Sequence, residues 1–171
     1  MRTPASIARH PIHPMLITLP IGLWIFSFVC DLVVYFSDGS EAGVLWLMIG
    51  YWTMAGGLAG ALIAAVPGLI DLLSLTDRNV RKIATTHMSI NLVVVVLYGI
   101  NLWLRSLDPP DFLTGMGLSV IGLILLVISG WLGGEMVHVH GVGVAGRVAP
   151  DTFVSDEAEH AEPGATRLGH R

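Results

Sequence analysis

Seven side chains that can bind metals stand at the ends of the long apolar stretches of this sequence. His10 and His13 lie in the segment HPIHP, directly before the run that begins at Met15, and His87 lies directly before another run. The remaining four follow two further runs: Asp71, Glu135, His138 and His140. Imidazole with carboxylate binds zinc or non-haem iron, and two imidazoles on facing helices bind the iron of a b-type haem. These residue types therefore indicate metal or haem ligation.

The residues alone leave three interpretations of this cluster open. In the first, His13 and His87 face each other at one depth and hold haem b beside the small residues of positions 56–65. In the second, a divalent metal is bound by members of a larger set: His10, His13, Asp71, His87, Glu135, His138 and His140. In the third, the cluster is hydrogen-bonded and holds no cofactor. Under either cofactor interpretation, Asp71 is the expected acceptor for the other ring nitrogen of a ligand histidine.

The elements that position these residues are predicted to be membrane-spanning helices. The chain has 171 residues, of which 53% are hydrophobic and only 13% are charged, about half the charged fraction of a soluble domain. Four apolar stretches are long enough to cross a bilayer, at about residues 15–36, 44–70, 87–105 and 113–133. Since backbone polar groups must be paired inside lipid, each stretch is expected to be a helix. The sequence thus predicts an all-α fold, a four-helix transmembrane bundle over residues 1–146.

Positive charges predict the orientation of the bundle. Arg2 and Arg9 precede the first span, and Arg78, Arg81 and Lys82 lie between the second and third. The connection between spans one and two has no Lys or Arg, and that between spans three and four has a single Arg. The positive-inside rule then places both termini, and with them every histidine of the cluster, at the cytoplasmic face. The outer face has no histidine that could bind a second haem. Electron transfer across the whole membrane through two haems is therefore not expected, and electrons would pass to a quinone or a partner subunit.

Two spans carry a polar stripe at helical spacing. The third span has His87, Asn91, Tyr98, Asn101 and Arg105, and the first has His13, Pro20, Trp24, Ser27, Asp31 and Tyr35. Asp31 is costly in lipid as a bare charge, so a contact with Arg105 or Asn101 is predicted. Pro20 is expected to bend its helix, and Cys30 to be a small apolar filler. If the segment His138-Val-His140 is extended, both of its imidazoles lie on the same side.

The C-terminal residues 147–171 differ from the rest of the chain. They are acidic, poor in large apolar side chains and interrupted by Pro and Gly, which predicts a disordered tail. The segment from Pro150 onward has a net charge of −3 and so accounts for most of the −4 of the chain, and no basic cluster indicates nucleic-acid binding. No GxSxG motif or Ser, His and Asp set at one depth occurs, so hydrolase chemistry has no support and an enzyme is not expected.

Four segments in a fixed order carry a family resemblance: HPIHPMLITLPIGL followed by Asp31, PGLID at residues 67–71, His87 with Asn91, and GG with HGVGV at residues 133–144. Together they resemble the DUF2231 family of predicted bacterial membrane proteins over about residues 9–146. The resemblance implies a four-span protein of the bacterial inner membrane and no catalytic residue. Some members look to be joined to, or encoded near, Rieske-type iron–sulfur domains, which implies a redox role. This chain ends instead in an acidic tail without iron–sulfur ligands, which weakens that implication.

Two functions follow as hypotheses. The first is a small membrane protein that binds haem b or a metal for electron transfer, with the lipid bilayer and a redox partner around it. The second is a cofactor-free accessory subunit that packs against a larger membrane complex through its glycine-rich faces. A proton-coupled transporter would need polar groups at the midplane and, as a rule, repeated halves. Neither is evident in the sequence.

Overall fold

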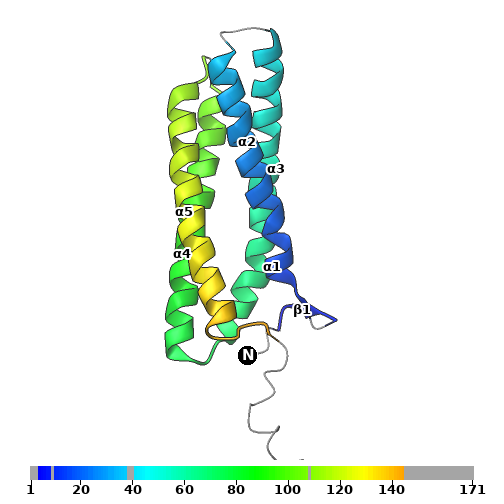
Figure 1. Cartoon of the computed structure of the whole chain (residues 1–171), viewed down its shortest axis with the longest axis vertical. Coiled ribbons are helices and arrows are strands. Elements are labelled where there is room, and N and C mark those ends of the chain that lie inside the picture. The colour runs from blue at the N-terminus through cyan, green and yellow to red at the C-terminus, as the bar shows by residue number, and fades with distance from the viewer. Residues whose placement is uncertain (1–3, 9, 38–40, 108, 145–171) are drawn as a thin grey trace, which may run out of the picture.

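The computed structural model describes residues 4–8, 10–37, 41–107 and 109–144. The tail predicted for residues 147–171 lies outside these ranges. Among the described residues, five helices and one two-stranded sheet form: β1 (Ser6–Ile7), β2 (His10–Pro11), α1 (Ile12–Leu16), α2 (Thr18–Phe36), α3 (Glu41–Ser74), α4 (Arg78–Arg105) and α5 (Phe112–His138). The long helices stand side by side, with the N-terminal strands at the lower end of the bundle (Figure 1).

The predicted all-α, four-span architecture is confirmed. Helices α1 and α2 form one span, Ile12–Phe36, and α3, α4 and α5 form the other three. Most large apolar side chains of these helices point outward; Trp52, Val127 and Trp131 are 67%, 74% and 79% exposed. In water such a surface would drive aggregation, but lipid tails solvate it. The outward apolar faces therefore fit a bundle surrounded by a bilayer.

The helices run past the apolar stretches that predict them. Helix α4 begins at Arg78 because the Asp77 side chain accepts hydrogen bonds from the amides of Asn79 and Val80. The sequence had predicted that this span begins at about His87. In the structure, His87 lies within α4, which begins at Arg78. Helix α3 continues through Pro67 to Ser74, beyond its predicted end.

The histidines near the two ends of the described chain lie close to helix ends, His13 at the start of α1 and His138 at the end of α5. His13 lies in α1, which continues into α2 through Ile17: this residue has a helical φ of −64° and ψ of −20°, and its amide bonds to the His13 oxygen. At the end of α5, the amides of Gly141 and Val142 bond to the carbonyls of Val137 and Met136, and Gly141 has a φ of +65°. The bond from the Gly141 amide to the Val137 oxygen is that of an αL C-cap, which needs a residue that tolerates positive φ. The condition of an extended segment at His138–His140 is not met, because α5 continues to His138 and Val139 keeps helical dihedrals.

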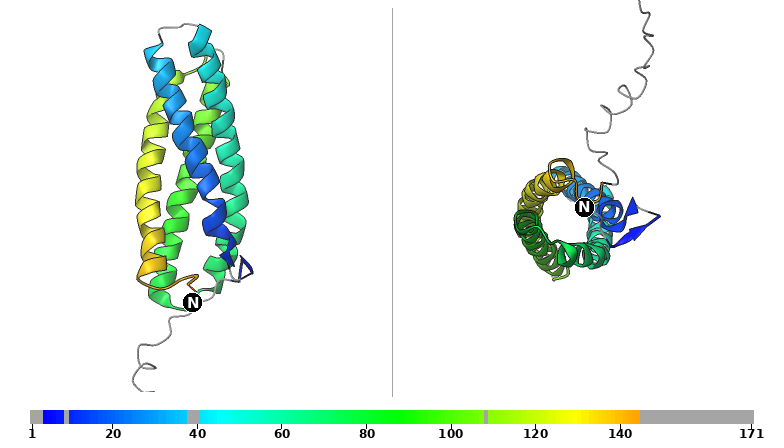
Figure 2. Two further views of the ribbon diagram at one scale, coloured as in Figure 1. Left: turned by 45° about the vertical axis from the view of Figure 1, so that its right-hand side comes forward. Right: turned by 90° about the horizontal axis from the view of Figure 1, so that it is seen from below.

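The four spans associate as two hairpins. Helix α2 packs mainly on α3, and α4 mainly on α5, whereas contacts of α3 with α4 and of α2 with α5 are fewer. Helices α1/α2 and α4 run in the same direction and α3 and α5 in the opposite one, so the two hairpins stand parallel around the long axis of the bundle (Figure 2). This is the geometry of a parallel repeat.

The contacts of the two hairpins repeat at constant intervals. His13, Trp24, Ser27 and Asp31 of the first hairpin correspond to His87, Tyr98, Asn101 and Arg105, each 74 positions later. On the return helices, Gly50, Gly57, Ala64 and Gly68 correspond to Gly115, Gly122, Ser129 and Gly133, each 65 positions later. A Cβ at Gly57 or Gly122 would meet Trp24 or Tyr98, and one at Gly68 or Gly133 would meet His13 or His87. The repeated halves that the sequence did not reveal are therefore present.

Three pairs of equivalent residues meet between the hairpins. His13 contacts His87 edge to face with ring centroids 6.3 Å apart, and Trp24 stacks on Tyr98 at 4.1 Å. Asp31 pairs with Arg105. Residues related by a two-fold rotation can touch only near its axis, so these pairs define the axis of the repeat. On α4 the aromatic pair lies about 16 Å, and the ion pair about 27 Å, from the histidines, which nearly spans a hydrocarbon core of about 30 Å.

Substitution of the inward glycines should test this packing. A Cβ on Gly57 would lie 2.5 Å from Trp24 Nε1, and one on Gly122 would lie 2.7 Å from Tyr98 Cε2. Because the two rings are stacked on each other, neither can retreat. Gly57→Ala and Gly122→Ala are expected to lower the free energy of unfolding by about 1–3 kcal/mol, measured by thermal unfolding in mild detergent.

Gly99→Ala is the matched control, since nothing lies within 4 Å of its Cβ. It should be neutral, or stabilising by up to about 1 kcal/mol through helix propensity. Equal stability of all three variants would show that the close approach is absent.

Candidate functional site

The candidate site is the histidine pair on the repeat axis. His13 comes from α1 and His87 from α4, and their imidazole planes are nearly perpendicular, at 86°. Both side chains are half-buried, and Gly68 and Gly133 on the return helices leave room for the two rings. The structure therefore brings together the two residues that the sequence selected as a ligand pair.

Main-chain carbonyls fix the protonation of both rings. His13 Nδ1 lies 2.8 Å from the oxygen of Ala64, and His87 Nδ1 lies 2.8 Å from the oxygen of Ser129. A carbonyl oxygen only accepts hydrogen bonds, so each Nδ1 must carry a proton. In the neutral form, Nε2 of each ring then carries a free lone pair. Histidine ligands of metals are oriented by such a bond from the opposite ring nitrogen.

Asn91 agrees with this assignment on the α4 side. Its Nδ2 lies 3.1 Å from His87 Nε2, 2.9 Å from the His87 oxygen and 2.8 Å from Ser129 Oγ. An amide nitrogen donates, so His87 Nε2 must accept. Since the amide has only two hydrogens for three acceptors, it can leave His87 Nε2 and stay bonded to the other two.

The other predicted ligands are placed differently. Asp71 Oδ1 accepts a hydrogen bond from the Ala5 amide at 3.0 Å, so it fastens the N-terminal segment to α3, and carbonyls take the role predicted for it at the imidazoles. His10 Nδ1 lies 3.0 Å from the Ala8 oxygen at the surface. Glu135, His138 and His140 lie at the end of α5, beside the αL C-cap at Gly141. Within the described ranges, no three His, Cys, Asp or Glu side chains are grouped closely enough to hold a metal ion, so the larger predicted set is not assembled.

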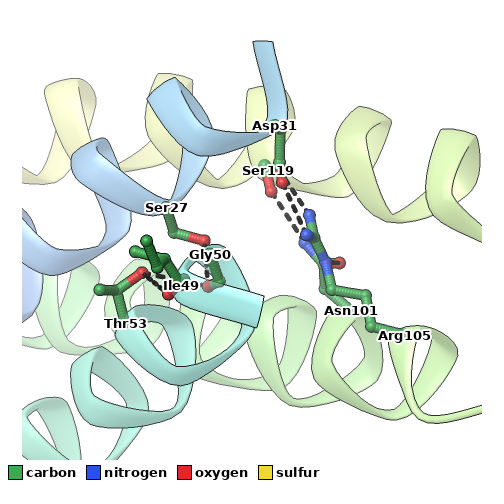
Figure 3. Close-up of polar contacts among 8 residues, drawn as sticks. All are labelled: Ser27, Asp31, Ile49, Gly50, Thr53, Asn101, Arg105 and Ser119. Carbon is green, nitrogen blue, oxygen red and sulfur yellow. Dashed lines mark hydrogen bonds and ion pairs between the residues drawn. The ribbon is translucent and has the colours of Figure 1, made fainter. Parts of the chain in front are cut away.

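The opposite end of the axis holds a buried ion pair, as the sequence predicts (Figure 3). The terminal nitrogens Nη1 and Nη2 of Arg105 donate to the Asp31 carboxylate, each at 2.6 Å, and Nε donates to Asn101 Oδ1 at 2.9 Å. Asn101 in turn donates to Ser119 Oγ, and Ser27 donates to the Gly50 oxygen. The side chains of Arg105 and Asp31 are 2% and 1% exposed. A cavity of about 250 Å³ lies beside this ion pair, and its lining includes Arg105 and Phe112.

The middle of the axis is aromatic. The rings of Trp24 and Tyr98 are parallel within 1° and both side chains are buried. Trp24 Nε1 donates to the Met54 oxygen at 3.3 Å, whereas the Tyr98 hydroxyl has no hydrogen-bond partner among the described residues. Cys30 is fully buried against Gly50, in agreement with its predicted role as a small filler.

A family model described as "Predicted membrane protein (DUF2231)" matches residues 9–146. This chain belongs to the DUF2231 family. No curated protein and no solved structure matches it. The matched range covers the four spans and both histidines of the pair, so the axis pairs of this DUF2231 protein all lie in the part that defines the family.

Sequence reasoning missed the groups of this DUF2231 protein that orient the imidazoles. The acceptors are the main-chain oxygens of Ala64 and Ser129. Every residue has a main-chain oxygen, so residue type does not identify these acceptors in the sequence. One signal was nevertheless available. The spacing of a histidine, an aromatic residue 11 positions later and a charge 7 positions after that occurs twice, and so does glycine at intervals of 7 and 11.

Removing one member of the ion pair should destabilise this DUF2231 bundle strongly. Asp31→Asn leaves the Arg105 charge buried without its counter-ion, and is expected to lower the free energy of unfolding by about 3–5 kcal/mol. Thermal unfolding in mild detergent measures the loss. The double variant Asp31→Leu/Arg105→Met removes both charges and should recover most of it. A double variant no more stable than Asp31→Asn would contradict the pairing.

Proposed function

We propose that this DUF2231 protein binds one b-type haem between His13 and His87 and acts as a one-electron carrier in the bacterial inner membrane. The observation that supports this most is the pair of hydrogen bonds from Nδ1 to carbonyl oxygens. They orient two imidazoles from opposite hairpins and leave a lone pair on each Nε2, which is the form that binds iron.

The number of protein ligands favours haem over a bare metal ion. A structural zinc site needs four protein ligands and a catalytic one needs three. Within the described ranges the two imidazoles have no third His, Cys, Asp or Glu grouped with them. A porphyrin supplies four equatorial nitrogens itself and asks the protein only for axial ligands.

The spacing of the rings also favours axial ligation. Two imidazoles that bind one ion from opposite sides, through bonds of about 2 Å, have centroids about 6 Å apart; at a tetrahedral angle the separation is about 5 Å. The centroids of His13 and His87 are 6.3 Å apart. His87 Nε2 must exchange its contact with Asn91 for the iron, and Asn91 has two further acceptors for its two hydrogens.

The orientation belongs to the same proposal. Arg78, Arg81 and Lys82 lie at the start of α4, at the end of the bundle that holds the histidines. Arg105, the one positive charge that the sequence placed at the other end, is buried in an ion pair and so is not a charge of the outer loop. The positive-inside rule then places the site at the cytoplasmic face, where it would exchange electrons with a quinone or a partner subunit.

An absorbance spectrum tests the proposal. The wild-type protein, produced with haem precursor and purified in mild detergent, should show a Soret band with about one haem per chain. His13→Ala/His87→Ala should lose the band because both axial ligands are gone. His10→Ala is the matched control, since His10 is exposed and bonds only to the nearby Ala8 oxygen, and should keep it.

A wild-type protein without a Soret band would refute the haem proposal. The function would then be that of the alternative hypothesis, a cofactor-free accessory subunit, for which the histidine pair is a hydrogen-bonded link between two hairpins. Equal loss of haem in His10→Ala and in the double variant would refute the assignment of the ligands.

A further inference from the structure

A cavity of about 250 Å³ lies at the end of the bundle opposite the histidines, beside the ion pair of Arg105 and Asp31. Leu47 and Phe112 are equivalent in the repeat, 65 positions apart, and both line the cavity, which therefore lies close to the axis. Arg105 is about 27 Å from His87 along α4, so the cavity takes no part in the function proposed above. Its walls come from the start of α3, the end of α4 and the start of α5, and include Val44, Leu47, Met48, Tyr51, Arg105 and Phe112.

Arg105 brings hydrogen-bond donors to the cavity without bringing a net charge. A guanidinium has five N–H groups. Nε uses one on Asn101, the two terminal nitrogens use one each on Asp31, and within the described ranges Arg105 makes no further hydrogen bond. Two N–H groups can therefore donate to a bound molecule. Because Asp31 already balances the charge in an apolar surrounding, a neutral acceptor such as a carbonyl oxygen is favoured over an anion.

The size and the aromatic lining of the cavity suit a flat ring. The Phe112 ring lies beside the guanidinium, with its centroid 5.8 Å from Arg105 Cζ, and Tyr51 contributes a second aromatic ring. An apolar cavity of about 150 Å³ is large enough to bind benzene. A cavity of about 250 Å³ thus has room for a six-membered ring with substituents.

The cavity is open to lipid on the α3 side. Val44 and Met48 line it and yet are 62% and 55% exposed, like the other apolar side chains that face the bilayer. A molecule can therefore place a ring inside the cavity and leave a long apolar tail among the lipid chains.

The other half of the repeat does not offer the same groups. The counterpart of Arg105 is Asp31, which accepts hydrogen bonds and does not donate them, and the counterpart of Tyr51 is Met116. Met48 corresponds to Leu113, which is 67% exposed and does not line the cavity. The repeat thus supplies a control surface of similar depth and hydrophobicity.

We propose that this cavity binds the ring of a membrane-soluble quinone, with a ring carbonyl accepting a hydrogen bond from Arg105 and the apolar tail in the bilayer. A quinone combines the required properties, since its ring is flat and neutral, its oxygens are acceptors and its tail is soluble in lipid. The inference concerns binding alone. It does not depend on the proposed haem, whose Soret band is a separate signal from the same sample.

Photo-crosslinking of the wild-type protein in mild detergent tests this site. The probe is an azido-substituted quinone with a short isoprenoid tail, and labelled peptides are identified by mass spectrometry. Labelling should saturate and should fall within residues 44–51 and 105–112, which line the cavity. Excess duroquinone should suppress it. Durene, the matched ring without oxygens, should compete far less, because it leaves the donors of Arg105 unpaired.

Variants at the mouth of the cavity test its position. Met48→Trp and Val44→Trp place a large ring at the opening and should lose most of the labelling, whereas Leu113→Trp should label as the wild type does. Since all three side chains are exposed, the variants should unfold at the wild-type temperature.

Three results would overturn the proposal. Labelling that does not saturate, or that persists in both Met48→Trp and Val44→Trp, would show that the quinone does not occupy the cavity. Equal competition by durene and duroquinone would refute the hydrogen bond to Arg105. Suppression by dioleoylglycerol as strong as that by duroquinone would show that the cavity takes a lipid chain and not a quinone ring.

Discussion

No hydrophobic force draws two helices together inside a bilayer, because lipid tails are as apolar as the side chains they would replace. The bundle therefore depends on close backbone approach within each hairpin and on a few specific contacts between the hairpins. Glycine provides the first at Gly57 and Gly122, where a methyl group would overlap an aromatic ring. The three pairs on the axis provide the second. Each satisfies a group that lipid cannot solvate or fills the space between the hairpins with a flat ring.

The pairs also set the depth of everything else. With the ion pair near one boundary of the hydrocarbon core and the histidines near the other, helices α2 and α4 cannot slide without stranding the Arg105 charge. The imidazoles are thus held level with each other by a contact at the far end of the bundle. Their second ring nitrogens are directed by helix carbonyls, which are themselves fixed by the return helices α3 and α5. Orientation at the site is consequently a property of the whole bundle.

The sequence was sufficient for the number of spans, the helical fold and the Asp31–Arg105 contact, because hydropathy and the cost of a charge in lipid leave few alternatives. It selected His13 and His87 correctly as neighbours from their places before two parallel spans. It failed where polar segments continue a helix, as at Arg78 and His138, since those turns carry no apolar signal. It also assigned to Asp71 the role of accepting a hydrogen bond from a ligand histidine, which main-chain carbonyls take in the structure. Main-chain acceptors cannot be recognised from residue type. The repeat escaped notice because the halves share spacing and few identities.

The internal repeat has a consequence for the chemistry of its axis. In a symmetric dimer of separate hairpins, a residue on the axis would face its own copy, so a carboxylate would meet a carboxylate and a guanidinium a guanidinium. When both hairpins belong to one chain, two equivalent positions can hold different residues. Asp31 and Arg105 occupy equivalent places and carry opposite signs, and Asn91 stands where the other half has Ile17. A single covalent connection at residues 75–77 thus allows a two-fold scaffold to carry an unlike pair at every level of its axis except the histidines.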